Sequence, residues 1–168
     1  MDGLEEIKIS EIETYENRYQ RIEEFIKGEL SLEEENALHN YKTHLLATIK
    51  ELSENVPNGL VHGDIKQEHI LINKETFDII GILDFGDVSI TNIEKEFAKL
   101  AGQEAYDLSF AIQVAKHYGS INIEHLIKRK EIYEKEWEIE KVLYSKQSGH
   151  PEYYKEGLAN IKALVKGH

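Results

Sequence analysis

Three side chains within residues 60–87 have types and spacing suited to chemistry. Asp64 directly follows a His-Gly pair, His69 lies five residues further on, and Asp84 follows a second apolar run. A carboxylate in a loop can accept a proton from a hydroxyl nucleophile. An imidazole and a carboxylate on one side of a hairpin can hold a divalent cation. The pattern therefore indicates a general base, Asp64, beside a cation-binding pair, His69 and Asp84.

The elements that position these residues are predicted to be strands. Branched apolar residues fill His69–Ile72 and Phe77–Leu83, and the polar segment Asn73–Thr76 between them is typical of a turn. The pattern predicts a β-hairpin. Asp84–Gly86 interrupts its second strand, and the glycine at position 86 allows the backbone to turn sharply after Asp84.

Helical spacing of apolar residues dominates the rest of the chain. Capping boxes begin at Ser10 and Ser31, each with a glutamate three residues later. The predicted helices run from Ser10 to about Gly28, from Ser31 to about Leu52, around Phe97 and Leu100, from Ala105 to Ala115, from Ser120 or Asn122 to Tyr144, and from Tyr154 to Val165. We expect one α+β, mainly helical domain, with the two acidic helices in residues 1–59 and a helical subdomain in 88–168.

The composition excludes several classes of function. The chain has 168 residues with 32 acids against 20 bases, a net charge of −12, and no cysteine. The acidic balance disfavours nucleic acid as a partner and suits a cationic one. The absence of cysteine excludes disulfides and thiolate metal sites. We expect a cytoplasmic protein without a membrane partner, because the sequence shows no apolar run of spanning length and no apolar signal core.

Each candidate residue alone is weak evidence, because a single histidine at a strand start is more often structural than a ligand. The ordered set is far more specific: His-Gly-Asp at 62–64, His69, a hairpin, then Asp-Phe-Gly at 84–86. This set resembles the catalytic loop and metal-binding segment of the aminoglycoside phosphotransferase family, which has a protein-kinase-like fold. The resemblance covers Leu60–Phe97 well.

The C-terminal part refines this resemblance. Residues Tyr133–Lys141 and Tyr153–Leu158 are most similar to the aminoglycoside 2''-phosphotransferases. Position 69 departs from the broad family, which usually has Asn there. The 2''-phosphotransferases and the macrolide phosphotransferases also carry His at this position, so His69 limits the resemblance to these subgroups of the family.

The resemblance implies a role for each residue of the set. Asp64 would orient or deprotonate the acceptor hydroxyl, and His69 and Asp84 would coordinate Mg²⁺ on the phosphates of ATP or GTP. His62 would brace the loop. Leu71 and Leu83 would lie under the nucleotide base.

Carboxylates beyond the metal segment are candidates for binding ammonium groups of the substrate. Glu96 also matches a family position that braces the loop, and Trp137 matches a position near the substrate pocket, although a partly buried core aromatic is an equal interpretation. The candidates are Asp87, Glu94, Glu96, Glu104, Asp107, Trp137 and Glu138.

The resemblance also implies that only one lobe is present. About sixty residues precede His62, and they show no glycine-rich loop and no strand with the paired lysine of the N-terminal β lobe. We expect a C-terminal lobe with the N-terminal β lobe absent. The chain would then be a fragment of a full enzyme, a lobe completed by a partner chain, or a non-catalytic relative.

The expected function is transfer of the nucleotide γ-phosphate to a hydroxyl of an aminoglycoside-like substrate, as in antibiotic resistance, with weak or no turnover by the isolated lobe. One alternative is a non-catalytic acidic helical module that binds a cationic ligand or a partner protein. Another is a relative of kinases that phosphorylate macrolides or other small alcohols. We also expect self-association, or binding of a missing N-terminal lobe, through the apolar floor around Leu71 and Leu83.

Overall fold

The computed structural model describes residues 11–102, 107–119 and 121–166. These residues form two compact units. We call the described part of Asn55–Tyr133 the site unit, and the described parts of Ser10–Glu54 and Glu134–His168 the helical unit. No helix in the described ranges is long and apolar enough to cross a membrane.

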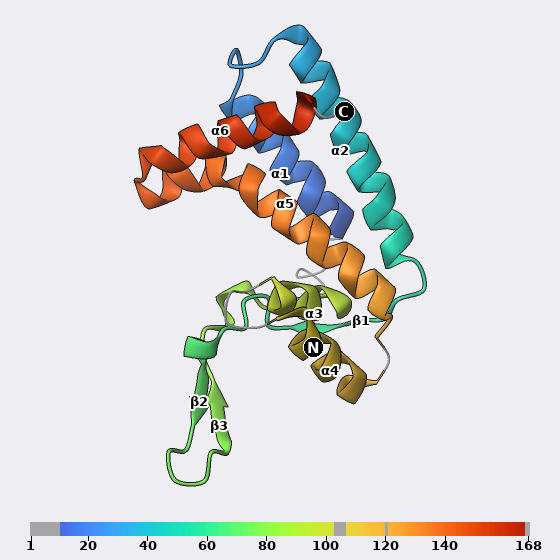
Figure 1. Cartoon of the computed structure of the whole chain (residues 1–168), viewed down its shortest axis with the longest axis vertical. Coiled ribbons are helices and arrows are strands. Elements are labelled where there is room, and N and C mark those ends of the chain that lie inside the picture. Colours follow the sequence, from blue (N-terminus) through green and yellow to red (C-terminus); the bar gives the residue numbers. More distant parts are fainter. Residues whose placement is uncertain (1–10, 103–106, 120, 167–168) are drawn as a thin grey trace, which may run out of the picture. The chain divides into compact units, whose positions relative to one another are not determined.

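The site unit contains two small antiparallel sheets of two strands each (Figure 1). In one, β1 (Asn58–Val61) pairs with β4 (Ser89–Asn92). In the other, β2 (Ile70–Ile72) pairs with β3 (Ile79–Ile82), which confirms the predicted hairpin. His69 was expected inside the first hairpin strand, but it ends the short 3₁₀ turn η2 (Gln67–His69) just before β2.

The helices α3 (Glu94–Ala101) and α4 (Leu108–Tyr118), with the first part of α5 (Ile123–Ser148), complete the site unit. Apolar side chains at helical spacing meet in one core, as the hydrophobic pattern requires. This core consists of Phe97, Leu100, Ala101, Ala111, Ala115 and Leu126. It gives α3 a buried face, so the opposite face of α3 is free to support the loops beside it.

The helical unit consists of α1 (Glu11–Phe25), α2 (Leu32–Ser53), the remainder of α5 and α6 (Pro151–Lys166). The predicted capping box at Ser31 is confirmed, because its hydroxyl accepts from the Glu34 N–H at 3.2 Å and its own N–H donates to the Glu34 carboxylate at 2.8 Å. The predicted cap at Ser10 lies outside the described residues. The core of this unit includes Tyr19, Ile22, Leu45, Ile49, Leu52, Ile139, Val142 and Ile161.

A carboxylate is buried in the core of the helical unit. Glu136 is only 1% exposed, and it accepts hydrogen bonds from the hydroxyls of Tyr19 at 2.7 Å and Tyr41 at 3.3 Å. Burial raises the pKa of Glu136 to about 7, although both tyrosines and Arg18 favour its charged form. This group changes charge near neutral pH inside a packed core.

Candidate active site

Asp64 lies just beyond β1, in a loop whose path depends on Gly63. This glycine has a φ of +83°, and a Cβ on it would clash with the carbonyl oxygen of Asp87. Any larger residue at position 63 would have to displace one of the two loops. Gly63 therefore brings the backbone of the Asp64 loop against the segment that follows Asp84.

His62 joins the same two segments through its side chain. Its Nε2 donates to the carbonyl oxygen of Leu83 at 2.8 Å, and its ring centroid lies 4.8 Å from that of Phe85. The side chain is buried. These contacts hold the loop before Asp64 against the chain on both sides of Asp84.

His69 has one ring nitrogen engaged by the backbone and the other directed at Asp84. Its Nδ1 lies 2.8 Å from the carbonyl oxygen of Asp64. A carbonyl only accepts, so Nδ1 carries the proton and Nε2 of the neutral ring keeps its lone pair. Nε2 is 3.6 Å from Asp84 Oδ2. Hydrogen bonding of the far nitrogen to a carbonyl is the usual way in which proteins orient a metal-binding histidine.

Asp84 adopts a left-handed backbone conformation, with φ 60° and ψ 66°, two residues after the end of β3. Left-handed aspartates are uncommon, and they occur where the local structure demands a sharp turn. The turn leaves the Asp84 side chain 63% exposed while it faces His69. A bound ligand can therefore reach this carboxylate.

The donor set formed by His69 Nε2 and the Asp84 carboxylate suits a divalent cation. Within the described residues no group of three or more potential ligands converges. Mg²⁺ commonly keeps several waters and binds through one or two protein ligands together with substrate phosphates. Two protein donors on an open surface fit that mode of binding.

Lys66 was not singled out from the sequence, yet it contacts the candidate base. Its Nζ lies 2.7 Å from Asp64 Oδ2. This hydrogen bond raises the pKa of Lys66, and the charges of Asp64, Glu68 and Asp84 act in the same direction. In the sequence, only the position of Lys66, two residues after Asp64, could have indicated this contact. No periodic pattern includes this lysine.

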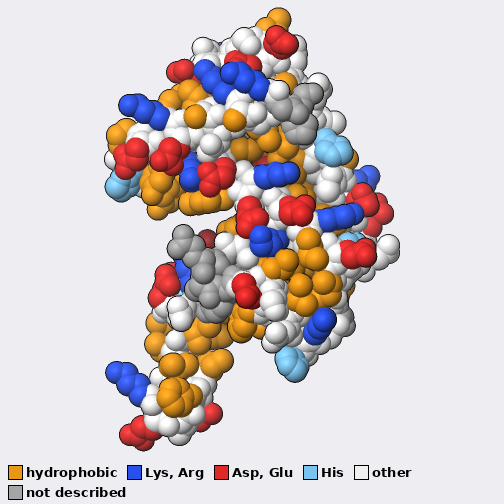
Figure 2. Space-filling model, in the orientation of Figure 1, with side chains coloured by type: hydrophobic (Ala, Val, Ile, Leu, Met, Phe, Trp, Pro, Cys, Tyr) orange, Lys and Arg blue, Asp and Glu red, His pale blue; other side chains and the backbone are white. Residues whose placement is uncertain are grey.

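Leu71 and Leu83 lie on or beside the hairpin, and both are exposed. Figure 2 shows hydrophobic side chains along the visible face of the hairpin as far as its tip. Phe77 at the tip is 75% exposed. The hairpin therefore presents an apolar surface next to the candidate metal pair.

The predicted substrate-binding acids in the site unit have different surroundings. Asp87 is exposed at the end of the turn η3 (Phe85–Asp87). Glu96 accepts from the N–H of Gly63 at 2.9 Å. Asp107 caps α4 by accepting from the N–H of Phe110 at 2.7 Å. Glu104 lies outside the described residues, as does the predicted helix start at Ala105.

Glu94 is engaged elsewhere. Its side chain is 1% exposed, accepts from the Asn122 N–H at 3.0 Å, and lies 3.6 Å from Arg129 and 3.4 Å from His125. A buried carboxylate with these partners is not available to a substrate ammonium group. Glu94 instead ties α3 to α5.

Trp137 and Glu138 belong to the helical unit. Trp137 is half exposed, and its ring lies 5.9 Å from that of Tyr144. Glu138 accepts from Lys141 at 2.7 Å and from Asn160 at 2.9 Å. Trp137 therefore stays partly exposed, and the Glu138 carboxylate is held between α5 and α6.

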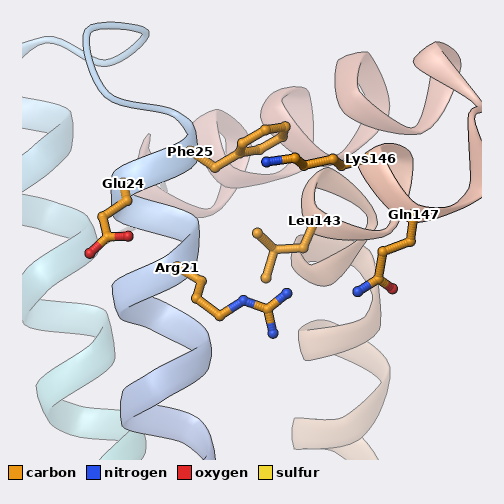
Figure 3. A pocket seen from close by; sticks show the side chains of 6 residues that line it. All are labelled: Arg21, Glu24, Phe25, Leu143, Lys146 and Gln147. Carbon is orange, nitrogen blue, oxygen red and sulfur yellow. The ribbon is translucent and has the colours of Figure 1, made fainter.

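The helical unit also contains an open hollow of about 640 Å³ between α1 and α5 (Figure 3). Its lining includes Phe25, Leu143 and two cations, Arg21 and Lys146. Lys146 Nζ lies 5.6 Å from the Phe25 ring centroid. None of the predicted site residues lines this hollow.

One family model and several solved structures are similar to this chain. The model of the family described as "Phosphotransferase enzyme family" matches residues 11–130. The chain is similar to the gentamicin complex of APH(2'')-IIa, with a TM-score of 0.83 and 16% identity over 96% of this chain and 54% of that one. It is also similar to ADP-bound aminoglycoside phosphotransferase APH(2'')-Ib, with a TM-score of 0.80 and 16% identity over 98% of this chain and 55% of that one. For the GDP and kanamycin complex of APH(2'')-IIIa, the TM-score is 0.68 and the identity is 17%, over 95% of this chain and 53% of that one.

The chain therefore spans about half the length of the solved structures it matches. At these identities the structural likeness establishes the kinase-like fold, here in a partial and mainly helical form, as expected from the sequence. The resemblance seen in the His-Gly-Asp and Asp-Phe-Gly segments is confirmed by the family match, which covers well over half of the chain. This chain belongs to the phosphotransferase enzyme family.

Proposed function

We propose that this chain supplies the general base and the metal-binding pair for phosphoryl transfer from ATP or GTP to a hydroxyl of a cationic, aminoglycoside-like substrate. One observation carries the proposal. His69 donates to the Asp64 backbone at 2.8 Å while its other nitrogen faces Asp84 at 3.6 Å. Base and metal ligands are thus linked by direct contacts within one unit.

Asp64 acts on the acceptor. Its carboxylate accepts the proton of the substrate hydroxyl as the hydroxyl oxygen forms a bond to the γ-phosphorus. The bond from that phosphorus to the β–γ bridging oxygen breaks, and the nucleoside diphosphate leaves with the electron pair. Because such transfer depends mainly on positioning and charge neutralisation, a few well-placed groups suffice.

The cations of the site balance the phosphate charge. His69 Nε2 and Asp84 would hold Mg²⁺, which supplies charge neutralisation at the phosphate oxygens when it is bound. Lys66 lies 2.7 Å from Asp64 and is 40% exposed, so its ammonium group can also reach a transferring phosphoryl group. In the resting protein, Lys66 keeps the Asp64 carboxylate oriented.

Substrate recognition is assigned to acidic side chains. Asp87 is exposed three residues after Asp84, where a substrate ammonium group would find an accessible carboxylate. Glu104, Asp107 and Glu138 stay predictions for the same role, and Trp137 stays a prediction for contact with the substrate. Glu96 stays a prediction both for that role and for bracing the loop, where its carboxylate accepts from the Gly63 N–H. We expect weak or no turnover by this chain alone, because it spans about half the length of the structures that it matches.

The test measures phosphate transfer from ATP and GTP to gentamicin and kanamycin with Mg²⁺. Asp64→Asn should lower the rate at least about a hundredfold, because it removes the proton acceptor but keeps the side-chain shape. Asp78→Asn, in the exposed hairpin turn, is the matched control and should leave the rate unchanged. Equal rates for wild type and Asp64→Asn would remove Asp64 from the mechanism.

A binding measurement covers the case in which turnover is too weak to follow. Calorimetry with Mg²⁺–nucleotide should show binding to wild type that Asp84→Asn weakens. Binding of an aminoglycoside without any binding of Mg²⁺–nucleotide would instead favour a non-catalytic module for cationic ligands. That alternative draws on the net charge of −12.

A further inference from the structure

Both backbone polar groups of Gly63 are bound by side chains of α3. The Gly63 N–H donates to Glu96 Oε2 at 2.9 Å, and the Gly63 carbonyl oxygen accepts a hydrogen bond from Lys99 Nζ. Glu96 and Lys99 are three residues apart, so they project from the same face of the helix. The residue directly before Asp64 therefore lies between a carboxylate and an ammonium group.

The helix α3, which carries these two side chains, is anchored in the core of the site unit. On its other face, α3 buries Phe97 and Leu100 in the core of the site unit. Lys99 is half buried, and its Nζ lies 5.5 Å from the centroid of the Tyr133 ring, within the range of a cation–π interaction. Charge-assisted hydrogen bonds from such an anchored helix are stronger than neutral ones.

We propose that Lys99 is a positioning residue for the Asp64 loop, acting together with Glu96 on the two sides of Gly63. A glycine has more accessible backbone conformations than any other residue, so Gly63 alone leaves the direction of Asp64 undetermined. Glu96 holds the peptide plane before Gly63. Lys99 holds the plane after it, which contains the amide of Asp64, and together they set both backbone angles.

The two partners also polarise this stretch of backbone in one direction. The carboxylate attracts the N–H and the ammonium group attracts the carbonyl oxygen, and hydrogen bonds in a chain strengthen one another in a low-dielectric setting. Removing Lys99 should therefore loosen the Glu96 bond as well. The assignment rests on the proposed function only in that Asp64 is taken to be the base.

The test follows the Gly63 amide by hydrogen exchange in ¹⁵N-labelled full chain. Lys99→Met keeps the aliphatic stem but removes the donor, and should raise the exchange rate of Gly63 about tenfold. Lys99→Arg should restore protection, because it returns a cationic donor. Lys116→Met, an exposed lysine at the end of α4, is the matched control and should behave as wild type.

Phosphate transfer forms the second arm. In Lys99→Met, kcat should fall about tenfold with the acceptor KM nearly unchanged, since the base is misplaced and the substrate contacts remain. Gly63 exchange equal to that of wild type in Lys99→Met would overturn the proposal, whatever the activity. Should Lys99→Met fail to fold, Lys99→Gln tests the same contact with a shorter, uncharged side chain: Gly63 exchange equal to that of wild type in that variant overturns the proposal. Absence of transfer by wild type, with Gly63 exchange responding as expected, would count against the proposed function and leave the positioning role supported.

Discussion

At the scale of single residues, Lys66 would have two competing partners during the proposed reaction. It pairs with Asp64 at 2.7 Å in this structure, and phosphate oxygens would compete for the same ammonium group. We expect Lys66→Met to lower the rate of phosphate transfer about tenfold to a hundredfold, because one preorganised cation is lost from the transferring group. Lys74→Met in the exposed hairpin turn is the control. Rates that fall equally in both variants would show a general charge effect instead.

Glu136 gives a second prediction at this scale, and its sign follows from linkage. Burial raises the pKa of Glu136 from 4.5 to about 7, so the folded protein binds a proton that the unfolded chain has lost between these pH values. The stability linked to this proton is fully present below about pH 4.5. It is lost as pH rises through about 7, and the free energy of unfolding falls by on the order of 3 kcal/mol.

Glu136→Gln should remove this pH dependence, because the amide stays neutral and can still accept from Tyr19. Denaturant unfolding at a series of pH values would compare wild type, Glu136→Gln and a control, Glu16→Gln, whose side chain is exposed on α1. The stability of Glu136→Gln relative to wild type should rise between pH 4.5 and 7. A constant difference over that range would contradict the shifted pKa.

At the scale of elements, the sequence predicts the strands and helices that have a strong periodic pattern and misses those whose pattern is weak. The hairpin strands and α2 follow clear patterns, and the structure confirms them. β4 was not predicted, because Ser-Ile-Thr-Asn is short and polar and becomes a strand only by pairing with β1. The helix expected at Ala105 is described from Leu108, where Asp107 provides the cap. Pairing between strands thus determines that β4 forms, and a capping residue determines where α4 begins. The periodic pattern shows neither.

The candidate site shows the same division. Motif spacing singled out Asp64, His69 and Asp84, and the structure brings their segments together. The contacts of Lys66 and Lys99 could not be predicted, because a lysine has no periodic signature and its flexible side chain reaches partners set by the fold. Lys99 meets Gly63 across 36 positions of sequence, a contact that depends on how α3 packs.

The capping box of α2 provides a prediction at the element scale. Ser31→Ala removes the hydroxyl that accepts from Glu34, and should lower the free energy of unfolding by about 1 kcal/mol. Asn40→Ala, on an exposed site in the middle of the same helix, should change it little or raise it slightly. Thermal and urea unfolding of both variants would check this. Equal stability of Ser31→Ala and wild type would show that the cap contributes nothing.

At the scale of the whole molecule, the hairpin departs from the usual rule that apolar residues are covered. Ile79 and Ile80 are 67% and 66% exposed, although strands with apolar residues on both faces are typical of buried sheets. Both strands are also edges, because β2 and β3 pair only with each other in the described sheets. Open edges together with exposed apolar side chains favour association.

We therefore expect the chain to self-associate through the β2–β3 hairpin, as the sequence already suggested for the region of Leu71 and Leu83. Replacing Ile79 and Ile80 with Thr keeps strand propensity but removes apolar area, and should shift the chain toward the monomer. Leu32→Gln is the matched control, because Leu32 is 74% exposed at the start of α2, away from the hairpin in sequence. Light scattering over a wide concentration range measures the outcome. A monomeric wild type at high concentration would contradict self-association. Loss of association in Leu32→Gln alone would show that the contact lies on α2 and not on the hairpin.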